Sequence, residues 1–196
     1  MSDRPSYLGL LNAISLGETN AGKYLGAWAA CTKDPDVQGV LATVALRETE
    51  HGIAFEKRMC ELGYGLRQRP DTEFEGKMRV ATADCTDREK FEAMGLGTEA
   101  GDRPDLFDDI FKDHSIDIQT GALLGRYVAE ERDSGRLLRG CYEVLCRREG
   151  RQPNGRAASS GGVTLDQLCA AVERLTGSVE RMQRELTPVR NGGARA

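Results

Sequence analysis

The sequence predicts an all-α protein, an antiparallel helical bundle with a long insertion and a C-terminal amphipathic helix. In three long stretches, residues 6–32, 34–63 and 115–148, apolar side chains recur at steps of three and four, the spacing of one helical face. Charged residues make up 30% of the chain and aromatic residues 6%, which is typical of helical bundles rather than of sheets. Only two residues, Lys33 and the capping Asp34, link the first two helices after Thr32, so these helices must form an antiparallel hairpin.

The first helix is expected at residues 6–32, and its inward face carries one carboxylate. That face reads Leu8, Leu11, Ile14, Glu18, Ala21, Gly22, Leu25, Trp28 and Ala29. An unpaired buried carboxylate costs several kcal/mol unless something neutralises it. Glu18 is therefore a candidate functional residue.

The second helix opens with an Asp cap and a proline at Asp34-Pro35-Asp36 and stops at Gly63. Its inward face reads Val37, Val40, Leu41, Val44, Glu48, His51, Gly52, Phe55 and Leu62. Glu18 and Glu48 each lie about 14 residues from the turn, so they reach the same height in the hairpin. Glu48 and His51 are three residues apart and share a face. Two carboxylates and an imidazole that converge are ligand types for iron, manganese or zinc.

The third long helix, at residues 115–148, repeats this pattern. Glu131 interrupts its apolar face, and the setting Glu131-x-x-x-Gly135 echoes Glu18-x-x-x-Gly22. Glu130 is a weaker candidate ligand, because it points about 100° away from the apolar face.

Glu18 on one helix and Glu48-x-x-His51 on the next resemble the ferritin-like superfamily, especially its rubrerythrin-like and encapsulated-ferritin branches. The resemblance covers residues 6–63, about a third of the chain. It implies a bundle that holds a di-iron centre, with Glu48 bridging, His51 as a terminal ligand, and Glu18 and Glu131 terminal or bridging. Iron would be oxidised by O₂ or peroxide, which implies ferroxidase or peroxidase activity. Manganese or zinc is also possible.

The sequence departs from the family pattern at the fourth helix. That helix is expected at residues 163–187, and its face reads Leu165, Leu168, Val172, Leu175, Val179, Met182 and Leu186, the spacing of a short coiled coil. Glu173 is a weak candidate ligand there, but Thr176 stands where a second histidine is needed. The chain's only other histidine, His114, reads as a loop residue. The six cysteines show no Cys-x-x-Cys spacing, so there is no rubredoxin-type iron module.

Two arrangements of a metal site remain open. In the first, one chain forms a four-helix bundle with a degenerate fourth position. In the second, two copies of the 6–63 hairpin pair about a two-fold axis. A homodimer or higher homo-oligomer is expected. The alternative functions are a metal-free helical scaffold that oligomerises through its C-terminal coiled coil, and a mononuclear structural site for zinc or another cation. Tyr24 and Tyr127 lie within two turns of candidate ligands and are possible redox residues.

The remaining segments divide the chain into a helical domain with an insertion, a linker and a tail. Residues 1–149 are expected to form the helical domain, with an insertion at 64–114 that contains short helices at 86–94 and 104–111. Residues 150–162 read as a flexible linker and 188–196 as a disordered tail. The net charge of −4 argues against nucleic-acid binding. Asp3, Glu18 and Lys23 flank the apolar start of the chain, so neither a signal peptide nor a membrane span is expected there. The sequence therefore predicts a cytoplasmic protein.

Overall fold

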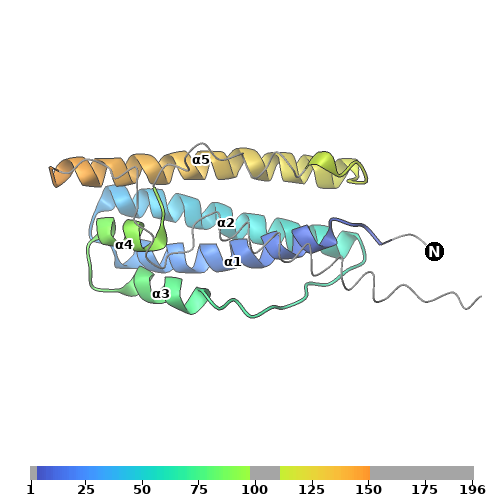
Figure 1. Cartoon of the computed structure of the whole chain (residues 1–196), viewed down its shortest axis with the longest axis horizontal. Coiled ribbons are helices and arrows are strands. Elements are labelled where there is room, and N and C mark those ends of the chain that lie inside the picture. Colours follow the sequence, from blue (N-terminus) through green and yellow to red (C-terminus); the bar gives the residue numbers. More distant parts are fainter. Residues whose placement is uncertain (1–3, 98–110, 151–196) are drawn as a thin grey trace, which may run out of the picture.

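Three long helices lie side by side in the computed structural model of the chain, which describes residues 4–97 and 111–150 (Figure 1). They are α1 (Leu8–Cys31), α2 (Pro35–Glu61) and α5 (Ile118–Arg148). The short helices α3 (Phe74–Thr82) and α4 (Asp87–Met94) lie between α2 and α5 in the sequence. The described residues contain no strand, so the expected all-α class is confirmed for this part of the chain.

The hairpin of α1 and α2 forms as expected from its turn. The side chain of Asp34 caps α2 by accepting hydrogen bonds from the backbone N–H groups of Asp36 and Val37, at 2.9 and 3.3 Å. Pro35 occupies the first turn, where a missing N–H costs nothing. At the far end, Gly63 has a φ of 82°, a conformation that glycine adopts readily.

Two glycines let α1 and α2 approach closely, and each faces a threonine of the other helix. A Cβ added at Gly22 would lie 2.3 Å from Thr49 Oγ1, and one at Gly52 would lie 2.4 Å from Thr19 Oγ1. The sequence Glu-Thr-x-x-Gly occurs once on each helix, at 18–22 and at 48–52. The contact is therefore reciprocal, and it places Glu18 and Glu48 at one height.

The insertion helices α3 and α4 lie toward one end of the three long helices, where α3 contacts α1 and α4 contacts α5. The expected helix at 86–94 is confirmed as α4, with Thr86 as its cap in a capping box. The helix α3 was not expected. It is held by tertiary contacts, since the buried Lys90 donates a hydrogen bond to the Ala81 carbonyl near its C-terminus, at 2.9 Å.

Helix α5 is tied to α2 at both ends. Near its start, Arg58 of α2 donates hydrogen bonds to Asp117 and Thr120, at 2.8 and 2.9 Å. Near its end, Arg148 bridges to Asp34 and Asp36, at 2.6 and 2.7 Å. The expected helix at 115–148 is thus confirmed, apart from a start three residues later, where Asp117 supplies the cap.

The apolar core consists of two clusters. The larger lies toward the α1–α2 turn and α4, and it includes Trp28, Leu41, Phe91 and Tyr142. The smaller lies toward the other end and includes Leu11, Phe55, Leu124 and Tyr127. Between them in the sequence of α1 and α2 stand Glu18, Glu48 and His51, which form a polar layer across the interior.

Several expectations lie outside the described residues. These are the helix at 104–111 except for Phe111, the linker at 150–162 beyond its first residue, the helix at 163–187 with Glu173 and Thr176, and the tail at 188–196. Among the described helices, none combines the length and the hydropathy needed to span a bilayer.

Candidate metal centre

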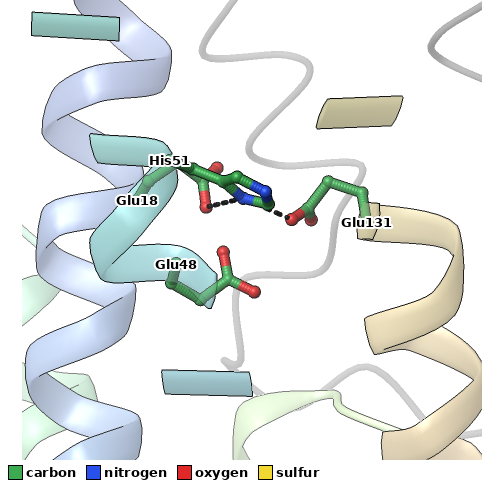
Figure 2. Close-up of side chains that lie close together, drawn as sticks. All are labelled: Glu18, Glu48, His51 and Glu131. Atoms are coloured by element: carbon green, nitrogen blue, oxygen red, sulfur yellow. Dashed lines mark ion pairs between the residues drawn. The ribbon is translucent and has the colours of Figure 1, made fainter. Parts of the chain in front are cut away.

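Three carboxylates and one imidazole converge inside the bundle. Glu18 comes from α1, Glu48 and His51 from α2, and Glu131 from α5 (Figure 2). One ligand-type atom from each lies within 4.8 Å of the others. The side chains of His51 and Glu18 are 5% and 7% exposed, Glu48 is also buried, and the Glu131 side chain is 19% exposed. The cluster is thus closed on the α1–α2 side and reaches toward solvent beside α5.

The two ring nitrogens of His51 have different surroundings. Nε2 lies 2.7 Å from Glu130 Oε2, a normal hydrogen-bond distance. Nδ1 faces the cluster, 3.4 Å from Glu131 Oε1 and 4.0 Å from Glu18 Oε2 (Figure 2). Within the described part of the chain, His51 Nδ1 and Glu131 Oε1 are buried and have no hydrogen-bond partner. Buried polar atoms are nearly always satisfied, so this pair marks a position suited to a further atom.

Burial makes the two innermost carboxylates hard to ionise. It raises the pKa of Glu18, although a hydrogen bond from Tyr127, at 2.8 Å to Glu18 Oε1, works in the opposite direction. Burial also raises the pKa of Glu48 strongly, and the hydrogen bond and negative charge of Glu18 raise it further. Without a cation, the cluster therefore retains protons that carboxylates lose in water.

The acidic neighbours of His51 raise its pKa. Burial alone lowers the pKa of His51, but the interactions with Glu131 and Glu130 outweigh it, and the pKa rises. Burial raises the pKa of Glu130, but its contacts with His51 and Arg126 outweigh this, and the pKa falls. Positive charge is thus favoured at the centre of the site.

The structure brings together the four stronger candidates of the sequence analysis and separates the others. Glu130 is not in the four-residue cluster, because it lies on the Nε2 side of the His51 ring. His114 is exposed in the loop before α5. Sequence reasoning missed the pairing of Glu130 with His51; a helical wheel gives the direction of Glu130 but not the position of α2.

The two tyrosines differ in their relation to the cluster. Tyr127 contacts it directly through Glu18, and its ring packs edge-on against His51 with a centroid separation of 5.1 Å. Tyr24 lies next to it, where burial raises its pKa and the charges of Glu48 and Glu18 add to the effect. Lys77 of α3 lies over the Tyr24 ring, 5.4 Å from its centroid.

The donor set fits a divalent cation with a preference for oxygen and imidazole ligands. Carboxylates and one imidazole suit iron and manganese, and they also accept zinc. A cation between these side chains would satisfy His51 Nδ1 and Glu131 Oε1 and would neutralise the crowded carboxylates. No protein-family model, curated protein or solved structure matches the chain.

Proposed function

We propose that this is a ferritin-like iron-binding protein with a carboxylate–histidine centre and ferroxidase or peroxidase-type activity. The observation that carries the proposal is the buried Nδ1 of His51, which makes no hydrogen bond and faces three carboxylates, with Glu131 Oε1 at 3.4 Å. A histidine with only a packing role would direct both ring nitrogens to protein partners or to water. The ferritin-like assignment rests on the Glu18 and Glu48-x-x-His51 pattern in an antiparallel helical hairpin.

Each residue has a defined task in this proposal. His51 Nδ1 and the carboxylates of Glu18, Glu48 and Glu131 would hold the metal. A bound iron would supply one-electron redox chemistry toward O₂ or peroxide. Tyr127 holds the Glu18 carboxylate in place by hydrogen bonding, and the apolar residues around it exclude water from that side. Metal entry would occur beside Glu131, the most exposed of the four side chains.

The centre is proposed to be complete for one metal within a single chain. All four donors come from one chain, which favours this arrangement over half-sites that need a partner. A second iron would require further donors, from the residues after 150 or from a second copy. The family resemblance implies two irons. Two irons per chain would indicate a complete two-iron site within one chain, whereas one iron per chain indicates a shared two-iron site if the molecular mass is that of a dimer and a one-metal site if it is that of a monomer.

The first test is metal content after anaerobic Fe(II) loading of the wild type, His51→Ala and His114→Ala. The chain has only these two histidines, and His114 is exposed and remote from the cluster, which makes it a matched control. We expect about one or two irons per chain in the wild type and in His114→Ala, and a large loss in His51→Ala, which lacks the only nitrogen ligand. Parallel loading with Mn(II) and Zn(II) ranks the metals.

A second candidate function is a metal-free helical scaffold. It is favoured by the hydrogen bonds that the cluster residues already make within the protein. Tyr127 bonds Glu18, and Glu18 bonds Glu48. A folded wild type that holds no iron, manganese or zinc above the level of His51→Ala would establish the scaffold and refute the oxidase. Rapid O₂ or peroxide consumption on Fe(II) addition, absent in His51→Ala, would establish the redox activity.

A further inference from the structure

We propose that Glu130 is a positioning residue, held by Arg126, that fixes the His51 ring so that its Nδ1 lone pair points at the carboxylates. This inference rests on the proposed function, because it assigns a task to a residue outside the metal-binding set. It is carried by a chain of contacts across the seam between α2 and α5.

The two oxygens of Glu130 contact different partners. Oε2 lies 2.7 Å from His51 Nε2, and Oε1 lies 3.0 Å from Arg126 Nε. Arg126 also donates a hydrogen bond to Glu50 Oε1, at 2.6 Å. Glu50 and His51 are adjacent on α2, so Arg126 and Glu130 on α5 bind neighbouring positions of the facing helix. Both Glu130 oxygens are engaged, which directs its carboxylate at the ring nitrogen and away from the metal position.

A carboxylate at Nε2 decides which nitrogen carries the proton. An ionised carboxylate only accepts hydrogen bonds, so the nitrogen beside it must be N–H. In the neutral ring the other nitrogen, Nδ1, then has a free lone pair. Without Glu130, the carboxylates of Glu131 and Glu18 would favour a proton on Nδ1, and a protonated Nδ1 cannot bind a metal.

Tyr127, the other neighbour of the His51 ring, restricts the plane of the ring but does not determine which nitrogen carries the proton. Tyr127 packs edge-on against His51, with an interplanar angle of 84°, and this contact restricts the plane of the ring. Its hydroxyl donates a hydrogen bond to Glu18, at 2.8 Å. Within the described residues, the hydrogen bond to Glu130 therefore distinguishes the two nitrogens. Histidine ligands in other metal proteins commonly donate their second N–H to a carboxylate, and losing that partner costs about 10–100-fold in affinity.

The test compares Glu130→Leu with Glu130→Gln and with Glu50→Leu as the matched control. Glu50→Leu removes the other carboxylate partner of Arg126 but does not touch His51. Two measurements are made on each variant. One is the anaerobic Fe(II) dissociation constant by equilibrium dialysis, and the other is the ¹⁵N NMR signature of the His51 ring in the metal-free protein. The spectrum has two histidines, and His51→Ala assigns them.

At a pH above the titration of His51, where the ring is neutral, we expect the wild-type ring to be protonated on Nε2 and the proton to move to Nδ1 in Glu130→Leu. Fe(II) affinity should fall about 10–100-fold in Glu130→Leu and stay near the wild-type value in Glu50→Leu. Glu130→Gln should recover most of the affinity, because its amide oxygen can accept the same hydrogen bond.

The outcomes separate this inference from the proposed function. A wild type that binds Fe(II) with an affinity unchanged in Glu130→Leu overturns the positioning role and leaves the metal site intact. A wild type that binds no metal, but whose Nε2 proton moves in Glu130→Leu, refutes the metal site and supports the orienting contact. A ring protonated on Nδ1 alone in the wild type overturns the inference directly.

Discussion

In the metal-free protein, Glu48 has the environment least favourable to an ionised carboxylate. It is 5% exposed, and it lies beside Glu18 and Glu131 in an interior that disfavours negative charge. Burial raises its pKa far above the usual range of a glutamate, so the native state keeps a proton that the unfolded chain releases. The same holds for Glu18, whose pKa is also raised by burial.

These shifts predict an unusual pH dependence of stability for the metal-free protein. Above pH 4.5 the unfolded chain binds fewer protons than the native state, so the free energy of unfolding should fall as the pH rises from 5.5 to 8. His51 acts in the same direction, because its raised pKa contributes stability that is lost at higher pH. Each retained proton is worth at most about 1.4 kcal/mol per pH unit. Urea unfolding across this range measures the slope.

Glu48→Gln provides the control for this pH effect. It removes one titrating group with little change in volume, so its stability should decline less steeply than that of the wild type. A wild-type free energy of unfolding that is flat or rising over the same range would contradict the assignment of buried, protonated carboxylates.

At the scale of single residues, the sequence predicted the cluster well because the cue is local. A carboxylate in an apolar face is visible from helical spacing alone, and this identified Glu18, Glu48, His51 and Glu131. The partner of His51 Nε2 was not predictable in this way. Glu130 lies off the apolar face of its own helix, and only the placement of α5 beside α2 brings it to the ring.

At the scale of helices, the reciprocal glycines set how closely α1 approaches α2. Gly22→Ala would place a methyl group 2.3 Å from Thr49 Oγ1 and 3.1 Å from the Ala45 carbonyl, which is backbone and cannot move aside. We expect a loss of about 1–3 kcal/mol, the usual cost of overpacking. Thermal or urea unfolding of the metal-free protein measures it.

Gly17→Ala is the matched control within the same helix. An added Cβ at Gly17 meets no atom within 4 Å, and alanine is the better helix former, so a gain of about 0.5–1 kcal/mol is expected. If both variants were equally stable, close packing at Gly22 would not be what limits the helix separation. If Gly22→Ala also lost iron binding, the glycine contact would be shown to set the spacing of Glu18 and Glu48.

The elements differ in how far the sequence could predict them. The helices α1, α2 and α5 were predicted within three residues at each end, because long apolar periodicity and Asp caps act locally. Helix α4 was predicted at 86–94 and begins one residue later, at Asp87. Helix α3 was missed, because its nine residues depend on contacts made elsewhere. Among these are the ring of Phe74, 5.8 Å from Lys23 Nζ, and the bond from Lys90 to Ala81.

At the scale of the whole molecule, a polar layer separates two apolar clusters. A metal that bridges α1, α2 and α5 in this layer would bind the native state and not the unfolded chain. We expect Fe(II) at 100 times its dissociation constant to raise the free energy of unfolding by about 2.7 kcal/mol. Anaerobic chemical unfolding with and without Fe(II) measures this gain.

The same titration on Glu131→Gln isolates the contribution of α5. Glu131 is the only member of the cluster that α5 supplies, so the variant should lose much of the gain while the metal-free stability changes little. A full gain in Glu131→Gln would restrict the site to the α1–α2 hairpin and would favour pairing of two chains.

The symmetry of the α1–α2 hairpin has a consequence for how such centres arise. Each position in the Glu-Thr-x-x-Gly segment of α1 corresponds to the position thirty residues later in α2, so Ala21 is the counterpart of His51. One replacement, Ala21→His, would give both helices the same Glu-x-x-His pattern. A two-histidine pattern thus differs from this sequence by a single amino acid within one hairpin.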